Sequence, residues 1–479
     1  MMFFVKNTER SRHENHNVPH SILRLQQPVK PENHPGLPGP LPGHFRPARR
    51  QPGIAGLAHG EWARLLSVST RGRRSGYSSE QLLRALLVMV LEDTDLRGTV
   101  VLVENSEFLQ TFVRLGPQSV MDFTFLDRAL NALSPRAWEA LNLLLAGHAV
   151  REGKIGPEKV RVDSTVYETN IHYPTDSALL WDSFRTVARL VRQLQQAAPE
   201  LGLRHRFHDR KVKKLFTFIA RNGGSKSKST QRRVKTHYRH LLFAVRWIAG
   251  VGQEVLAHSG QTGWLLSNLV VVGLREELDH YLPLVARVIF QAEERILQGR
   301  TVPPDEKLYS IFEEHTEMLL RGKAGKPLEF GHMIVLAQTG EKFIHHYRVL
   351  ERRQADPELL PGALATHRLL FDRDPDLLTT DKGFYQSREQ LAELRAKIPQ
   401  VSIAKKGRRT AAETARETSE AFMAGQRFRA GIEGSISVLK RAFKLRRCLF
   451  KGFKHYAASV GLAVLCHNLV LLARLWTKT

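Results

Sequence analysis

The sequence is 479 residues long and carries a formal net charge of +25, with 42% hydrophobic residues and two cysteines. A chain of this length can bury a large core and is expected to hold more than one domain. The excess of Lys and Arg favours a polyanionic partner such as DNA, although composition alone also fits a ribosomal or membrane-surface protein. Cys448 and Cys466 lack CxxC spacing, which argues against a disulfide scaffold or zinc site and indicates a reducing compartment.

The N-terminal third begins with a segment rich in Pro, His, Arg and Asn, and we predict a disordered basic tail over residues 1–55. Residues 1–5 are too short an apolar run for a signal peptide. Residues 56–155 are predicted to form an all-α domain, because Ser78 begins a capping-box pattern and Ser134 precedes a proline. No stretch there demands a recognition helix, so a helix-turn-helix role and a packing role both stay open.

The segment from Val160 to Asn170 alternates apolar and polar residues, which predicts a half-buried strand. Asp163 then points to the face opposite Val160 and Val162. A carboxylate is a poor strand former and is costly to desolvate, so it needs a reason to stand in mid-strand. One reason is a hard divalent cation, which needs more than one carboxylate. A satisfied polar residue is the alternative.

Residues 196–325 are predicted to form a basic helical insertion. Aromatic residues are interleaved with the positive charges between Arg204 and Arg246, which favours a surface that grips DNA backbone. The alternative is a solvated charged face with aromatic residues in the core. The residues expected to contact phosphates are Lys211, Lys213, Lys214, Arg232, Arg233 and Lys235.

A β-hairpin is predicted after the insertion, with its turn at residues 338–341, followed by a helix near residues 364–371. The histidines of this region invite a metal site, but hard two-metal sites favour oxygen ligands, so a structural role is predicted for them. They are His332, His345 and His346.

A short buried strand, residues 377–380, ends at Asp381, a second candidate carboxylate, and Gly383 allows a turn directly after it. Three other acids compete for this role but stand in a polar stretch around a proline and are predicted to be loop residues: Asp372, Asp374 and Asp376. A further strand, residues 401–404, leads into a basic loop, for which DNA contact and simple solvation are both considered. Its candidate residues are Lys405, Lys406, Arg408 and Arg409.

Residues 426–447 are predicted to be a helix on which Arg429, Glu433 and Lys440 share one face. Two acids on strands and a third on a late helix suggest phosphoryl chemistry with two cations about 3.5–4 Å apart. Plainer explanations exist, since Asp381 can be a turn former and Glu433 an i,i+4 partner of Arg429. The ordered set favours a metal site.

The segments around these acids resemble the DDE transposases of bacterial insertion sequences, most closely the ISNCY group. The late helix carries the family spacing Tyr-x2-Arg-x3-Glu-x6-Lys at Arg429, Glu433 and Lys440, with Gln426 in place of the tyrosine. Residues 163–177 look like the group's first-aspartate motif, and residues 380–384 look like its second-aspartate motif. Between them, residues 321–331 look like the segment that enters the group's next strand. The likeness runs from about Ser78 to Leu475.

The resemblance implies an α/β fold with a ribonuclease-H-like catalytic domain, formed by residues 156–195 and 326–450 and interrupted by the large helical insertion. An all-α N-terminal domain would precede it and serve end binding or dimerisation. Residues 451–479 are expected to form a terminal helix packed on the core rather than a membrane anchor, because polar residues interrupt its apolar run.

The resemblance further implies a DNA transposase that cuts its element's ends with metal-activated water and joins the new 3′ hydroxyl to target DNA. Asp163, Asp381 and Glu433 would hold two Mg²⁺ or Mn²⁺ ions. Lys440 and Arg429 would bind phosphate, unless Arg429 only orients Glu433. Expected partners are double-stranded DNA and a second copy in a homodimer, with no membrane, in the cytoplasm at the nucleoid. A nuclease without strand transfer and an inactivated DNA-binding relative are the alternatives.

Overall fold

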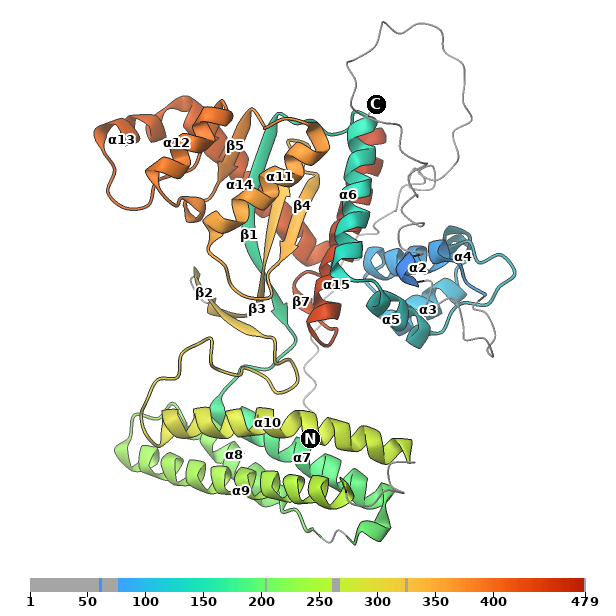
Figure 1. Ribbon diagram of the computed structural model, residues 1–479, viewed down its shortest axis with the longest axis vertical. Coiled ribbons are helices and arrows are strands. Elements are labelled where there is room, and N and C mark those ends of the chain that lie inside the picture. Colours follow the sequence, from blue (N-terminus) through green and yellow to red (C-terminus); the bar gives the residue numbers. More distant parts are fainter. Residues whose placement is uncertain (1–59, 63–75, 203–204, 261–267, 324–325, 478–479) are drawn as a thin grey trace, which may run out of the picture.

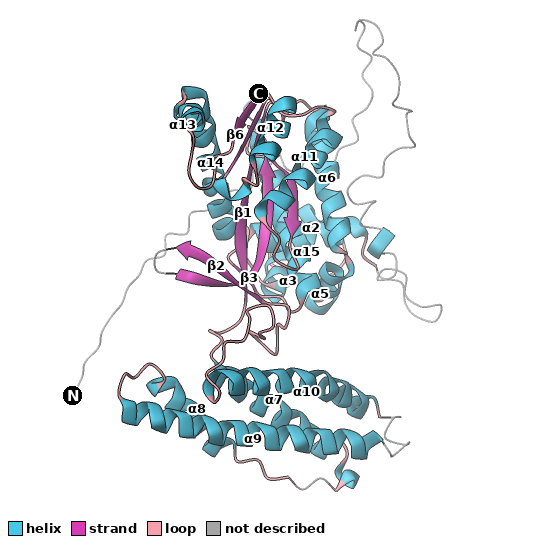
Figure 2. Ribbon diagram, turned by 60° about the vertical axis from the view of Figure 1, so that its left-hand side comes forward, coloured by secondary structure: helices cyan, strands magenta, loops and turns pink. Residues whose placement is uncertain are grey.

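A helix-covered sheet and a bundle of long helices make up the protein (Figures 1 and 2). The computed structural model describes residues 60–62, 76–202, 205–260, 268–323 and 326–477. The tail predicted for residues 1–55 lies outside these ranges.

The mixed sheet is built around β1, which pairs with β3 in antiparallel and with β5 in parallel. β6 continues the sheet parallel to β5, while β2 and β4 pair antiparallel with different parts of β3. The predicted hairpin is therefore confirmed as β3 and β4, whereas β2 extends the sheet into a region that the sequence assigned to the insertion. The strands are β1 (Lys159–Thr169), β2 (Glu317–Lys323), β3 (Lys326–Gln338), β4 (Ile344–Val349), β5 (Leu377–Thr380), β6 (Gln400–Ser402) and β7 (Arg447–Cys448), which pairs with the end of β1.

The side chains of β1 divide between the two faces of the sheet, as its alternating pattern predicts. Val160 and Val162 share a buried cluster with Leu360 of α11 (Asp356–Phe371). Tyr167 faces the other way and belongs to a second buried cluster, which includes Ile432 of α14 (Glu420–Ala442). Asp163 and Arg161, at odd positions like Tyr167, meet α14 as well. The predicted orientation of Asp163 is thus confirmed.

The N-terminal helices share their core with the last helix of the chain, α15 (Phe453–Trp476). Ser78 caps α2 in a capping box with Gln81, and Ser134 caps α6 ahead of Pro135, as predicted. Both α6 and α15 also contact β4, so the N-terminal helices and the sheet form one packed unit. They are α2 (Ser79–Leu91), α3 (Leu96–Glu104), α4 (Glu107–Val113), α5 (Phe123–Ala132) and α6 (Pro135–Arg151).

Helix α15 is the one described helix long and apolar enough to cross a membrane by length and composition. Its most apolar window is 83% buried inside the protein, and Asn468 within it bonds both the N–H and the C=O of Ile344 on β4. These are the features of a core helix.

The bundle has its own apolar core, formed by α7, α8, α9 and α10. α7 follows β1 and carries a long buried stripe that includes Phe184 and Val191. Because this stripe packs on the other helices of the bundle, the helical unit begins at Asp176, earlier than the boundary predicted at residue 196. The helices are α7 (Asp176–Ala197), α8 (Asp209–Asn222), α9 (Lys228–Gly260) and α10 (Leu269–Ile296).

Candidate active site

Two of the predicted carboxylates leave neighbouring strands side by side. Val162 of β1 is in register with Thr380 of β5, and the two strands run parallel. The next residues along the chain are Asp163, still within β1, and Asp381, the first residue after β5. Both line one cavity of about 660 Å³ at the edge where β5 ends. The parallel register therefore brings together two acids that are more than two hundred positions apart in the sequence.

The two acids differ in their surroundings. The Asp163 side chain is 14% exposed; its Oδ1 accepts a hydrogen bond from the Ser164 N–H at 2.7 Å. Asp381 is exposed and stands just before a 3-10 helix of residues Lys382–Phe384, which its side chain does not cap. Asp381 is therefore reachable from solvent, while Asp163 forms the inner wall.

The third predicted acid, Glu433, reaches Asp163 only through Arg429. Arg429 donates to Asp163 Oδ2 from Nη1 at 3.4 Å and to Glu433 Oε1 from Nη2 at 3.0 Å. The Glu433 side chain is 66% exposed, whereas that of Arg429 is 19% exposed. The i,i+4 pairing considered for Arg429 and Glu433 is thus present, and the same guanidinium continues to Asp163.

Helix α14 is held on the ends of β5 and β6 by polar contacts. Gln426, which stands where the resembling family has tyrosine, donates from Nε2 to the Ser402 carbonyl at 2.6 Å and the Thr380 carbonyl at 3.4 Å. Thr379 Oγ1 donates to the Gly425 carbonyl at 3.1 Å. A Cβ on Gly425 would lie 2.2 Å from Ser402 Oγ, so only glycine allows this approach.

Asp163 and Asp381 fit a divalent cation, because carboxylate oxygens are the ligands that Mg²⁺ and Mn²⁺ prefer. Glu433 is turned to Arg429 instead. Within the described ranges, no three His, Cys, Asp or Glu side chains gather closely enough to hold a metal ion. The arrangement thus offers two ligands in one cavity and a third acid one ion pair away.

Sequence reasoning missed a third acid of this cavity, Asp356, at the start of α11. A Cβ on Gly383 would lie 2.6 Å from Asp356 Oδ2, so the absence of a side chain at Gly383 leaves room for this carboxylate. An acid in the first turn of a helix has an ordinary explanation in the helix dipole. For that reason nothing in the sequence singled it out.

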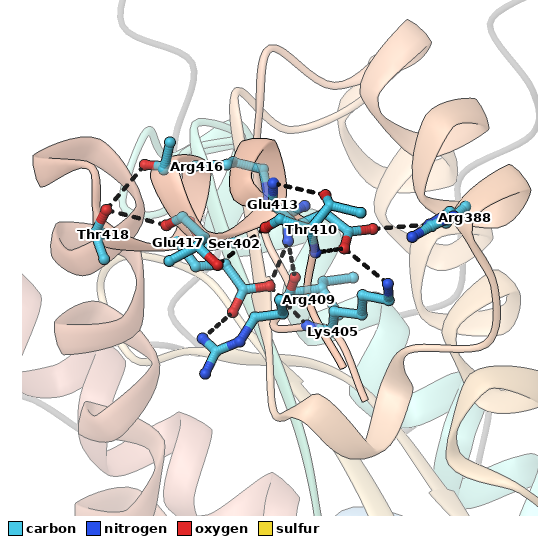
Figure 3. A network of polar contacts seen from close by, with 12 residues as sticks. Arg388, Ser402, Lys405, Arg409, Thr410, Glu413, Arg416, Glu417 and Thr418 are labelled. Carbon is cyan, nitrogen blue, oxygen red and sulfur yellow. Dashed lines mark hydrogen bonds and ion pairs between the residues drawn. The ribbon is translucent and has the colours of Figure 1, made fainter. Parts of the chain in front are cut away.

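The basic loop of residues 405–409 is partly tied down by α13 (Ala411–Thr418), as Figure 3 shows. Lys405 Nζ lies 2.7 Å from Glu413 Oε2, and Arg409 Nη1 lies 3.0 Å from Glu417 Oε2. Lys406 instead lines the cavity and donates to the Gly383 carbonyl at 2.6 Å. Arg408 is exposed. Of the four predicted contacts, Lys406 is therefore the one that lines the cavity together with Asp381.

Lys440 lies two turns beyond Glu433 on the same face of α14 and is partly exposed. The competing acids of the β5 loop lie in surface ion pairs, Asp374 with Arg368 and Asp376 with Arg373. Their assignment to the loop is confirmed.

The hairpin histidines are part of the interior. Burial lowers the pKa of His332 to about 3 and that of His346 to about 4, so both are neutral near pH 7. His332 Nε2 lies 2.7 Å from His315 Nδ1. This burial agrees with the structural role predicted for them.

The basic residues of the insertion lie on α8 and α9, where no Asp or Glu stands between Arg210 and Gln253. Lys235 differs from the others, because it is partly buried and its Nζ donates to the Leu297 carbonyl at 3.3 Å. Tyr238 is buried, while the exposed fraction of Trp247 is 41%, so only part of the aromatic set belongs to the core. The exposed basic residues are Lys211, Lys213, Lys214, Arg232 and Arg233.

Residues 321–469 match the family described as "Transposase DDE domain". The matched segment contains Asp381 and Glu433, and Asp163 precedes it. No curated protein and no solved structure matches the chain. The mixed α/β fold, in which Asp163 on β1 and Asp381 after β5 line one cavity, and the family match support a DDE-type transposase, a class of nucleotidyl-transferase. Enzymes of this family generally depend on divalent metal ions.

Proposed function

We propose that this protein is a DNA transposase that cleaves the ends of its element and joins the new 3′ hydroxyl to target DNA. The observation that carries the proposal is the placement of Asp163, within β1, beside Asp381, which directly follows the parallel strand β5, on one cavity. The sheet order β4-β3-β1-β5-β6, in which β3 runs antiparallel to the other four strands, supports a ribonuclease-H-like catalytic fold.

Asp163 and Asp381 would hold Mg²⁺ or Mn²⁺, and Glu433 would complete a site for two ions. Such ions, when bound, activate the attacking oxygen and stabilise the leaving one. Arg429 pairs with both Asp163 and Glu433, so its guanidinium keeps Glu433 close to Asp163. A DNA phosphate near Arg429 would compete for its guanidinium and free Glu433 to turn toward the cavity.

The cations around the cavity would bind the DNA backbone close to the scissile bond. Lys406 lies at the Asp381 side, and Arg429 and Lys440 lie along α14. Lys405 and Arg409 already have carboxylate partners, so we assign them mainly to the shape of the loop, with Arg408 as its exposed charge.

The basic face of α8 and α9 would grip DNA phosphates farther from the cut, because its charges lack acidic neighbours along the chain. The N-terminal helices would bind element ends or a second copy of the chain in a homodimer. We place this activity in the cytoplasm, at the nucleoid.

The test is an incubation of the purified chain with plasmid DNA that carries the inverted repeats flanking its gene. With Mg²⁺ or Mn²⁺ we expect breaks at the repeat boundary that leave 3′ hydroxyls, followed by joining of these ends to a second DNA. Breaks without joining would favour the nuclease. DNA binding with neither step would favour the inactivated relative.

A further inference from the structure

Arg161 is a buried cation without an acidic partner among the residues that the structure describes. It is only 3% exposed, and its hydrogen bonds go to a side-chain amide and a backbone carbonyl. Its Nη2 atom is buried without a hydrogen-bond partner. A guanidinium stays protonated in proteins and is costly to desolvate. Such a residue needs a compensating role.

The bonds that Arg161 does form join three elements. Nε donates to Gln338 Oε1 on β3 at 3.1 Å, and Nη1 donates to the Phe428 carbonyl of α14 at 2.9 Å. The guanidinium also lies over the Phe428 ring, 4.8 Å from its centroid. Phe428 stands in mid-helix, and its carbonyl has a second lone pair beyond the one used within the helix. Arg161 therefore ties α14 to the sheet.

The Arg161 guanidinium fits against α14 because residue 431 is a glycine. A Cβ on Gly431 would lie 2.3 Å from Arg161 Nη1, so any other residue there would push the guanidinium or the helix away. Gly434, three positions later on α14, has nothing within 4 Å of its own added Cβ. The close approach is thus specific to Gly431 and Arg161.

The contact lies next to the residues of the candidate site. Arg161 stands two positions before Asp163 and on the same face of β1. Phe428 directly precedes Arg429, which meets both Asp163 and Glu433. Because a helix moves as a rigid rod over so short a span, a shift at Phe428 would displace Glu433 as well.

We propose that Arg161 is a positioning residue. It fixes the position of α14 on the sheet by packing against Gly431, and so places Glu433 within reach of Asp163 and Asp381. This inference rests on the proposed function for its catalytic consequence. The docking itself rests only on the contacts of Arg161.

The experiment compares Gly431→Ala with the matched control Gly434→Ala. Both add one methyl group to α14 and remove no polar atom. Gly431→Ala should slow end cleavage by at least about tenfold and raise the Mn²⁺ concentration for half-maximal rate by at least about threefold, because Glu433 is misplaced as a ligand. Binding to end DNA should stay within about twofold. Gly434→Ala should match the parent in all three measurements.

A double-variant cycle shows whether the added methyl group acts through Arg161. Arg161→Met should reproduce the Gly431→Ala defect, and the double variant should be no slower than Arg161→Met alone. Arg161→Lys, which keeps a cationic donor, should recover at least about threefold of the lost rate. Additive losses, or an unchanged Mn²⁺ requirement in Gly431→Ala, would overturn the proposal.

Amide hydrogen exchange of residues 426–433 gives a readout that needs neither DNA nor metal. It should be faster in Gly431→Ala and Arg161→Met than in the parent and in Gly434→Ala. Equal exchange in all four proteins would show that Arg161 does not dock α14. If the parent itself fails to cleave DNA, the proposed function is lost, and the exchange rates alone decide on the docking role.

Discussion

Arg429 on α14 forms an ion pair with Asp163 on β1, with 3.4 Å between Nη1 and Oδ2. The same guanidinium binds Glu433. One side chain thus links the innermost acid of the cavity to the acid on the late helix. A cation in this position attracts the same carboxylates that a divalent ion would use, so the two compete for them.

Replacing Arg429 by Gln should strengthen metal binding in the absence of DNA. The change removes a positive charge beside Asp163, and we expect the Mn²⁺ affinity, measured by calorimetry, to rise by at least about fivefold. Cleavage should fall, because a phosphate ligand is lost. The control is Arg427→Gln, which removes an exposed charge from the same helix. Equal Mn²⁺ affinity in the two variants would contradict the competition.

Two neighbouring lysines should respond differently to the same substitution. Lys405 is 11% exposed and bonded to Glu413, so Lys405→Gln should lower the melting temperature. Lys406 lines the cavity, so Lys406→Gln should leave the melting temperature within about 1 °C and weaken end-DNA binding and cleavage. The reverse pattern would exclude Lys406 from the DNA interface.

The pH dependence of the Lys405 effect follows from its partner. Hydrogen bonds from Arg388 and then Lys405 hold the pKa of Glu413 well below its usual range. A carboxyl with a depressed folded-state pKa stabilises the fold above its unfolded pKa, and this contribution is lost as the pH falls. Because parent and Lys405→Gln share the same unfolded-state pKa, the difference in their unfolding free energies depends only on the folded-state pKa of Glu413 in each. Loss of Lys405 should raise that pKa, so the difference should stay constant from neutral pH down to about pH 4.5 and shrink only at lower pH, where Glu413 becomes protonated in the folded variant. A difference that grows as the pH falls would contradict the pairing.

Metal dependence should distinguish binding from chemistry. Mg²⁺ or Mn²⁺ should support cleavage, whereas Ca²⁺ should support DNA binding with little cleavage, because its longer and looser coordination positions the attacking oxygen poorly. The measurement is a cleavage time course and a binding titration with each ion. Full activity in EDTA would exclude a metal-dependent reaction.

The exposed cations of the bundle should contribute to DNA affinity through counterion release. Replacing Lys211, Lys213, Lys214, Arg232 and Arg233 by Gln should flatten the dependence of log affinity on log salt by up to about 4 units, since each phosphate contact contributes about 0.9. Preference for element ends over random DNA should change little, because phosphate contacts do not read bases.

Lys235→Gln is the internal control for this titration, because Lys235 is already bonded to the Leu297 carbonyl. It should leave the salt dependence unchanged, whereas the loss of a phosphate contact at Lys235 would flatten it by about 0.9 units. Parallel lines for parent and five-residue variant would remove the bundle from the DNA interface and return that role to the N-terminal helices.

Local patterns predicted much of the site, because alternation and helical periodicity are properties of single segments. The period of two along residues 160–170 placed Asp163 on the face opposite the valines, and the helical period placed Arg429 and Glu433 together. The parallel register of Val162 with Thr380 is a long-range pairing. No pattern within either strand predicts this pairing. That Asp163 and Asp381 lie together was predicted instead from the ordered set of acids and the family likeness.

Other features depend on what lies opposite a residue and could not be predicted. Gly425 and Gly431 look like ordinary helix glycines until Ser402 and Arg161 are seen against them. Arg161 resembled any polar residue of a half-buried strand. The apolar residues of α7 recur at helical spacing, but nothing in their pattern identifies the partner, which is the rest of the bundle.

The most direct test of the proposed site is the single-turnover cleavage rate of variants that remove one carboxylate charge each. Asp163→Asn, Asp381→Asn and Glu433→Gln should each lose cleavage by far more than about tenfold, while end-DNA binding stays intact, because the amides are nearly isosteric and only the metal ligands are lost. Asp376→Asn, which changes an acid of the loop before β5 that is paired with Arg373 at the surface, should cleave like the parent. If any one of the three retained a rate within about tenfold of the parent, that residue would not belong to the catalytic site; if all three did, the site itself would be wrong.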